Sequence, residues 1–280
     1  MSRFFKNLKK RPVIALCFLY VASLIILSAA APVISSYDYD TQNLEGQFSP
    51  PTVKNYFGTD IKGRDLFVRI LYGAKISLIV GLLATFVSVV IGSIYGMTAG
   101  YFGGKLDNFM MRAVDVLYSL PFMFLVIILM VYLGRNFYVL FIALGMVSWL
   151  TMARIVRGQV ITLKNAEFIQ AARAVGTSDA RIIFRHILPN LINIIIVYSS
   201  LMIPAVILEE SFLSFLGLGI QPPACSLGSL ASMGAETINP VNIYWWLVFF
   251  PCAVLVLLLL ALNFIGDFLR DQFDPRKGNK

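Results

Sequence analysis

The sequence predicts an all-α polytopic membrane protein with about six transmembrane helices. Charged residues make up only 14% of the 280-residue chain, whereas soluble domains carry about 25%. The charges also gather in short stretches between apolar runs of about 20 residues, the length that a helix needs to cross a bilayer core of about 30 Å. Since a soluble domain keeps polar residues all over its surface, both observations favour a chain that crosses a membrane several times.

Six apolar runs are the candidate spans. They are residues 13–34, 76–100, 116–133, 137–152, 191–210 and 244–269. The sequence Gly134-Arg135-Asn136 predicts a tight hairpin between the third and the fourth. The first run follows basic residues and contains Ala29-Ala30-Ala31, so a cleaved signal peptide is the alternative for it. Its length exceeds the usual apolar region of a signal, about 7–15 residues, and favours a retained span.

The basic residues predict that both chain termini are cytoplasmic. With the N-terminus inside, most of the 23 Lys and Arg fall on the cytoplasmic side, which is the rule for membrane proteins. Topology thus explains the net charge of +8, and no nucleic-acid partner is expected. We expect a first span with an extracytoplasmic segment over residues 1–75, a transmembrane domain over 76–270 with a cytoplasmic loop at 158–190, and a cytoplasmic tail over 271–280.

The cytoplasmic loop contains the signals of two short helices. Asn165 is a good N-cap, and Glu167 follows in the first turn, where the helix dipole favours an acid. Gly176 suits the end of this helix. Residues 177–179 can start a second helix, which Pro189 is expected to stop.

One face of the first loop helix is narrow and apolar. Its members, at positions i, i+3, i+4 and i+7, are Phe168, Ala171, Ala172 and Val175. Two interpretations stay open. The face packs under its own bundle, or it enters a groove on a partner protein.

The same loop resembles a known family motif. Residues 170–176, Gln-Ala-Ala-Arg-Ala-Val-Gly, are followed after nine residues by His-Ile-Leu-Pro at 186–189. This pattern is similar to the EAA loop of ABC importer permeases. Gln170 stands where that motif has Glu, and His186 stands where it has Ile.

Other stretches resemble the peptide and nickel branch of these permeases, in the same order along the chain. Residues 58–65 read Gly-Thr-Asp-Ile-Lys-Gly-Arg-Asp, and residues 213–219 read Leu-Ser-Phe-Leu-Gly-Leu-Gly. Asp274-Pro275-Arg276 resembles the ending of the branch. One departure is Ser226-Leu227-Gly228, where Ser-Trp-Gly is expected.

The resemblance implies a permease subunit of an ATP-driven importer in a bacterial inner membrane. The substrate it implies is an oligopeptide or dipeptide, with nickel or another small solute as the alternative. The implied partners are a homologous second permease, two cytoplasmic ABC ATPase subunits and an extracytoplasmic solute-binding protein, besides the lipid bilayer. The loop residues implied to dock on the ATPase are Glu167, Phe168, Gln170, Ala171, Ala172, Gly176, His186, Leu188 and Pro189.

We expect the chain itself to bind no ATP, no other cofactor and no metal. A phosphate-binding loop needs G-x-x-x-x-G-K-[ST], but Gly104-Lys105 has Ala99 at the first glycine position and is followed by Leu106. The three cysteines form no CxxC pair, and His186 is the single histidine.

Two acids, Glu209 and Glu210, end the fifth apolar run. A charge at the centre of a span costs about 3 kcal/mol, so we expect both acids at the outer edge of the membrane. The simple interpretation is a pair of interfacial acids. The functional alternative, on the family resemblance, is a translocation path or outer gate formed by Glu210, Ser214 and Phe215.

Three further groups have a structural interpretation. Arg112 and Asp115 have the i, i+3 spacing of a local ion pair. Glycines 81, 92, 96 and 100 predict close helix packing, with the second permease as one candidate neighbour. Asp60 and Asp65 are expected to cap turns and a short helix along the membrane, and docking of a solute-binding protein is the alternative.

Two rival functions receive little support. A membrane enzyme would need paired carboxylates or a His and Asp set within its spans, and the spans contain no histidine. A transporter driven by an ion gradient would favour interior charges or broken helices in paired halves, which the sequence does not indicate.

Overall fold

The computed structural model describes residues 11–34, 38–134 and 136–273. Its α-helices are α2 (Pro12–Ile34), α3 (Leu66–Phe102), α4 (Gly104–Ser119), α5 (Phe122–Leu133), α6 (Phe137–Leu163), α7 (Glu167–Ala174), α8 (Asp179–Ile182), α9 (Leu188–Phe215), α10 (Leu227–Glu236) and α11 (Trp246–Phe273). A 3₁₀ helix, η1 (Leu44–Gly46), and a π-helix, η2 (Ile183–Ile187), complete the elements. The described ranges contain no β-strand, and the expected all-α class is confirmed.

The expected number of about six spans is also confirmed. Five helical stretches are long and apolar enough to cross a membrane, and the bent pair α4–α5 makes a sixth if it counts as one span. Asn136 begins α6 by accepting a hydrogen bond from the Val139 backbone N–H at 2.9 Å. This is the end of the predicted hairpin. Arg135 lies outside the described residues, as do residues 274–280 of the predicted tail.

The expected span over residues 116–133 is divided between two helices. The chain breaks at Leu120 and Pro121, and α4 and α5 meet at an angle of 89°. Leu120 is extended, with φ −80° and ψ 139°, because the ring of a following proline disfavours the helical conformation. Pro121 also lacks the N–H that would continue the helical hydrogen bonds.

Helix α3 is longer than expected and runs across the predicted boundary at residue 75. It begins at Leu66, where the Asp65 side chain accepts a hydrogen bond from the Val68 backbone N–H at 3.0 Å, and it continues for 37 residues. Because Lys75 and Arg69 lower the local hydropathy, the predicted apolar run began only at residue 76. Arg69 is nevertheless buried within the protein.

The glycine face of α3 packs inside this chain, against α6 and α9. Side chains at Gly92, Gly96 and Gly100 would meet backbone atoms of α6, and one at Gly81 would meet Ile207 of α9. The suggested contact of this face with a second permease is therefore wrong. Close approach of α3 to α6 is what these small residues allow.

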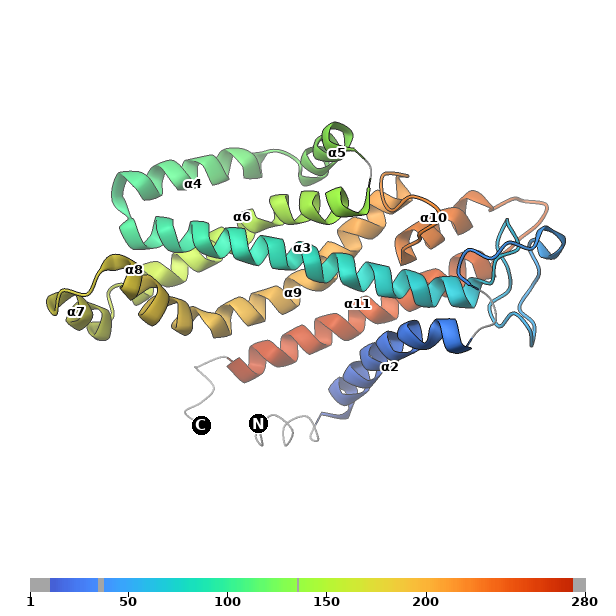
Figure 1. The fold of residues 1–280 in the computed structure, drawn as a ribbon, viewed down its shortest axis with the longest axis horizontal. Coiled ribbons are helices and arrows are strands. Elements are labelled where there is room, and N and C mark those ends of the chain that lie inside the picture. Colours follow the sequence, from blue (N-terminus) through green and yellow to red (C-terminus); the bar gives the residue numbers. More distant parts are fainter. Residues whose placement is uncertain (1–10, 35–37, 135, 274–280) are drawn as a thin grey trace.

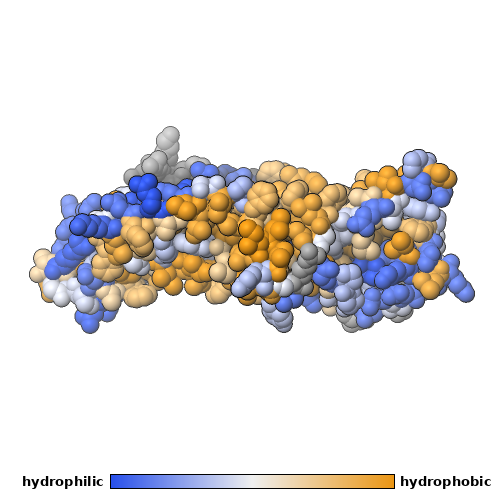
Figure 2. Space-filling model, turned by 90° about the horizontal axis from the view of Figure 1, so that it is seen from above, coloured by the Kyte–Doolittle hydropathy of each residue, from blue (hydrophilic) through white to orange (hydrophobic). Residues whose placement is uncertain are grey.

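The bundle has two distinct ends (Figure 1). Helices α7 and α8 lie at one end, and α10 with residues 38–65 lies at the other. Arg11 Nη1 and Asp271 Oδ2, 2.9 Å apart, join the beginning of α2 to the end of α11 on the side of α7 and α8. Figure 2 shows apolar residues gathered along the middle of one face, with hydrophilic residues toward both ends. This pattern fits a membrane around the middle of the bundle.

Candidate functional site

The cytoplasmic loop forms the predicted helix pair, with two changes at its ends. Asn165 does not cap α7, because its Nδ2 donates to the Ile161 carbonyl of α6 at 3.2 Å and Ala166 takes the cap position. Pro189 does not stop a helix. It lies in the first turn of α9, which follows the π-helix η2 without a break.

Gly176 ends α7 as predicted. Its φ of +80° is a left-handed conformation that glycine adopts without a steric penalty. The Gly176 N–H donates to the Arg173 carbonyl at 2.9 Å, and the Thr177 N–H donates to the Ala172 carbonyl at 3.1 Å. This hydrogen-bond pattern turns the chain sharply toward α8.

Helix α7 packs on the core through Ile169, which lies outside the predicted face, and through one member of that face, Ala172. Ile169 is fully buried, and Ala172 packs against the same cluster at the inner ends of α3 and α6. Phe168 and Val175 are 45% and 85% exposed, and Ala171 lies exposed between them. Packing under the bundle therefore applies to the side of α7 that carries Ile169 and Ala172. The side that carries Phe168, Ala171 and Val175 stays exposed.

The remaining predicted loop residues differ in their exposure. Glu167, Gln170 and Pro189 are exposed, whereas His186 and Leu188 are half-buried. Gln170 Nε2 donates to the Lys164 carbonyl at 3.3 Å. The amide of Gln170, which stands where the family motif has Glu, thus connects α7 with the end of α6.

The loop is fastened to the inner end of α3. The Tyr101 hydroxyl donates to Asp179 Oδ1 at 2.5 Å, and the Arg173 guanidinium lies 5.0 Å from the centre of the Tyr101 ring. Lys164 Nζ donates to the Gly100 carbonyl at 3.0 Å. Hydrogen bonds and a cation–π contact therefore connect the loop with the longest helix.

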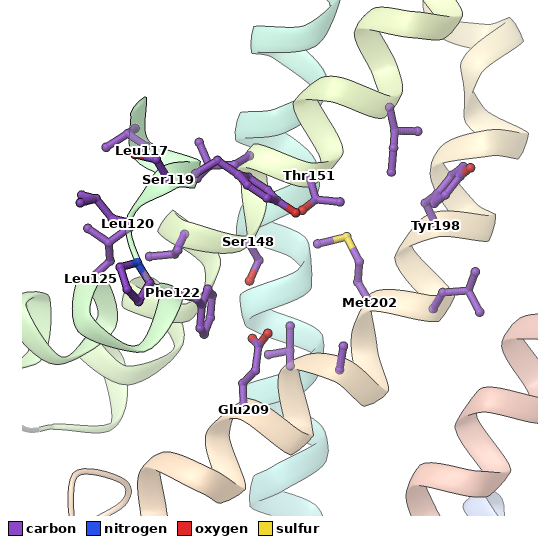
Figure 3. Close-up of a pocket in the computed structure, with 18 residues that line it drawn as sticks. Leu117, Ser119, Leu120, Phe122, Leu125, Ser148, Thr151, Tyr198, Met202 and Glu209 are labelled. Atoms are coloured by element: carbon purple, nitrogen blue, oxygen red, sulfur yellow. The ribbon is translucent and has the colours of Figure 1, made fainter. Parts of the chain in front are cut away.

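A cavity of about 610 Å³ lies between the α4–α5 break, α6 and α9 (Figure 3). Most of its lining is apolar, with hydroxyl groups from Tyr118, Ser119, Ser148, Thr151 and Tyr198. Glu209 is the single charged residue in the lining. A mostly apolar cavity with a few polar groups is typical of sites that hold small molecules.

The two acids of α9 have different surroundings, and the expectation of a pair of interfacial acids is wrong. Glu210 is fully buried, and its carboxylate accepts hydrogen bonds from Ser214 at 2.6 Å and from Ser77 at 3.4 Å. Glu209 lines the cavity instead. Neither Glu210, Ser214 nor Phe215 belongs to the lining.

The cavity residue that sequence reasoning missed is Glu209. Its signal was the spacing along α9, since Tyr198, Met202, Ala205 and Glu209 recur at i, i+4, i+7 and i+11. All four line the cavity. The carboxyl group of Glu209 therefore shares a helix face with the cavity wall.

The expected ion pair between Arg112 and Asp115 is also wrong. Asp115 Oδ1 lies 2.8 Å from Arg154 Nη2 of α6. The Arg154 guanidinium also stacks 4.1 Å from the centre of the Tyr118 ring. Asp115 thus pairs with Arg154 on a neighbouring helix, and not with Arg112 on its own helix.

Residues 88–279 match the family described as "Binding-protein-dependent transport system inner membrane component". The chain belongs to this family. Residues 1–51 match a second description, "N-terminal TM domain of oligopeptide transport permease C". The expected multi-pass location in the inner membrane and the expected family are confirmed.

Relatives of this permease carry peptide-transport names. The oligopeptide transport system permease protein OppC of Haemophilus influenzae is 47% identical over 98% of this chain and 86% of its own length. OppC of Escherichia coli K12 is 48% identical over 91% of this chain and 86% of its own length. The dipeptide transport system permease protein DppC of Bacillus subtilis is 43% identical over 97% of this chain and 84% of its own length.

A solved structure has the same fold at low identity. The MetNI methionine ABC transporter, in an inward-facing conformation, contains a chain that matches 74% of the permease and 97% of its own length. The TM-score is 0.59 and the identity is 18%. The arrangement of helices is therefore shared with the membrane part of a transporter.

The outer end of the permease is held by a buried charge cluster. Asp60 accepts hydrogen bonds from the backbone N–H groups of Lys62 and Arg64, and its Oδ2 lies 2.7 Å from Arg64 Nε. Arg69 Nε lies 3.5 Å from the same oxygen. The expected capping roles of Asp60 and Asp65 are confirmed, but the helix that Asp65 begins is the span α3 itself.

The outer helix α10 begins at the sequence departure. Ser226 caps α10 through Ser229, and the buried Leu227 donates its backbone N–H to the Ser77 hydroxyl at 3.2 Å. A side chain at Gly228 would collide with Ser211 of α9. Leu227 therefore fills a packed position between α3 and α9.

Proposed function

We propose that this permease forms half of a path that imports peptides, driven by ATP hydrolysis in separate subunits. The names of the OppC and DppC relatives support a peptide as the substrate, and nickel or another small solute stays the alternative. The partners in this proposal are a homologous second permease, two ATPase subunits and an extracytoplasmic solute-binding protein. The chain itself binds no nucleotide and no other cofactor in this proposal.

The observation that carries the proposal is the exposed half of α7. Phe168, Ala171 and Val175 present an apolar surface at the cytoplasmic end of the bundle, and an amphipathic helix of this kind fits a groove on a partner. The attachment through Tyr101 supports transmission of partner motion to α3. A second site, the cavity beside α9, supports passage of a solute.

The test compares two Val→Asp substitutions at exposed positions. Val175→Asp changes the exposed side of α7, and Val53→Asp changes an outer residue that is 92% exposed. We expect Val175→Asp to lower both co-purification of the ATPase subunits and uptake of a radiolabelled dipeptide at least about tenfold, because a buried unpaired charge at an interface is costly. Val53→Asp should leave co-purification intact. Equal co-purification with both variants would contradict docking through α7.

A further inference from the structure

Glu209 has an unsatisfied carboxylate oxygen beside the cavity. Its Oε2 is buried and accepts no hydrogen bond from the described residues. The other residues that line the cavity carry no charge. In Figure 3 the carboxyl group of Glu209 points toward the space between Ser148 and Phe122.

The neighbouring acid gives an internal comparison. Glu210 is equally part of α9 but accepts hydrogen bonds from Ser77 and Ser214, which come from α3 and α9. The protein thus satisfies the carboxylate of Glu210, whereas one oxygen of Glu209, in the wall of a cavity, has no partner among the described residues. Arg154, which lies over the ring of the cavity residue Tyr118, is paired with Asp115.

An ionised carboxylate in surroundings of low polarity is unfavourable without a partner charge. A cationic group that enters the cavity would supply that charge and two or three N–H donors. The attraction is stronger here than in water, because the apolar walls lower the effective dielectric constant. The cavity volume of about 610 Å³ lies within the range of small-molecule sites.

We propose that Glu209 recognises a positively charged group of the transported solute. If the solute is a peptide, the group is its terminal ammonium, and this part rests on the proposed function. Glu209 is then a specificity-determining residue of the path. The proposal assigns the role to Glu209 and gives Glu210 a structural role.

The test measures the charge preference of the cavity without any peptide. Cys17, Cys225 and Cys252 are replaced by Ser in the full chain, and Ser148→Cys places one thiol on the cavity wall. Ser148 donates only to the Leu144 carbonyl of its own helix, so this change is mild. In the assembled transporter, the thiol is modified with a cationic (trimethylammonium) and an anionic (sulfonate) methanethiosulfonate reagent, and the rates are compared.

We expect the cation-to-anion rate ratio to fall about tenfold when Glu209→Gln is added, because the substitution removes the charge and keeps the shape. Glu236→Gln, which removes an exposed acid of α10, should leave the ratio unchanged. An unchanged ratio in Glu209→Gln overturns the proposal. So does a lack of reaction at both Ser148→Cys and a second reporter, Thr151→Cys, since the cavity would then be closed to solutes.

Peptide uptake separates this proposal from the proposed function. Glu209→Gln should lower uptake of a dipeptide at limiting concentration at least about fivefold, and Glu209→Asp should restore part of it. If the parent transporter takes up no peptide but the reagent ratio still depends on Glu209, the peptide function fails and cation recognition stands. If uptake by Glu209→Gln equals that of the parent, recognition by Glu209 is wrong.

Discussion

The surroundings of a buried ionisable group determine how tightly it holds its proton. Cys225, just before α10, is 1% exposed, and its Sγ lies 3.6 Å from the Arg69 carbonyl, to which it donates. Burial raises the pKa of the Cys225 thiol to about 11, against about 8.5 for an ordinary thiol. The folded protein therefore holds this proton more tightly than the unfolded chain does, and the stability that results is lost as the pH rises from about 8.5 toward 11.

We predict that Cys225 resists alkylation in the folded permease. With Cys17 and Cys252 replaced by Ser, N-ethylmaleimide at pH 8 should modify Cys225 at least about a hundredfold more slowly before unfolding in dodecyl sulfate than after it, because both burial and the low thiolate fraction protect it. Mass spectrometry of timed samples measures the rates. Rapid modification of the folded protein would show that the region around α10 is open.

At the scale of elements, the contact of α3 with α6 depends on the absence of side chains. Gly92 and Gly96 lie against backbone atoms of α6, and a closely packed interior cannot accept an added methyl group without a shift of the helices.

We predict that Gly96→Ala lowers the thermal unfolding temperature of the purified permease by several degrees, since overpacking costs about 1–3 kcal/mol. Gly158→Ala in α6 is the matched control, because a side chain there meets no atom within 4 Å. Alanine is also favoured over glycine in a helix, by about 1 kcal/mol, so the control should be as stable as the parent or more so. Equal melting of both variants would contradict the tight contact.

The spans were largely predictable from the sequence, whereas several helix ends and the contacts between helices were not. Apolar run length located the spans, and Gly176 marked the end of α7, because both depend on local chemistry. The partner of Asp115 and the different surroundings of Glu209 and Glu210 depend on which helices lie side by side. The break at Pro121 follows from the local chemistry of proline, but the 89° angle depends on the packing of α5 against α6.

At the scale of the whole molecule, the bond between Tyr101 and Asp179 connects the proposed docking surface with the spans. We predict that Tyr101→Phe keeps assembly and ATP hydrolysis but lowers the amount of peptide taken up per ATP, because the loop loses a direct bond to α3. Both quantities are measured in proteoliposomes. Tyr20→Phe is the control, since it removes a hydroxyl that joins α2 to the Val254 carbonyl of α11 at 3.3 Å. An unchanged ratio in Tyr101→Phe would contradict a transmitting role for this bond.

The 37 residues of α3 make a rod of about 55 Å, longer than the full thickness of a bilayer, about 40–45 Å. One end bears Asp65 beside the outer charge cluster, and the other bears Tyr101 beside the cytoplasmic loop. A straight lever of this length that pivots at its middle by about 10° carries each tip about 5 Å in opposite directions. One unbroken helix thus connects the two sides of the membrane, so a movement at one end of α3 moves the other end as well.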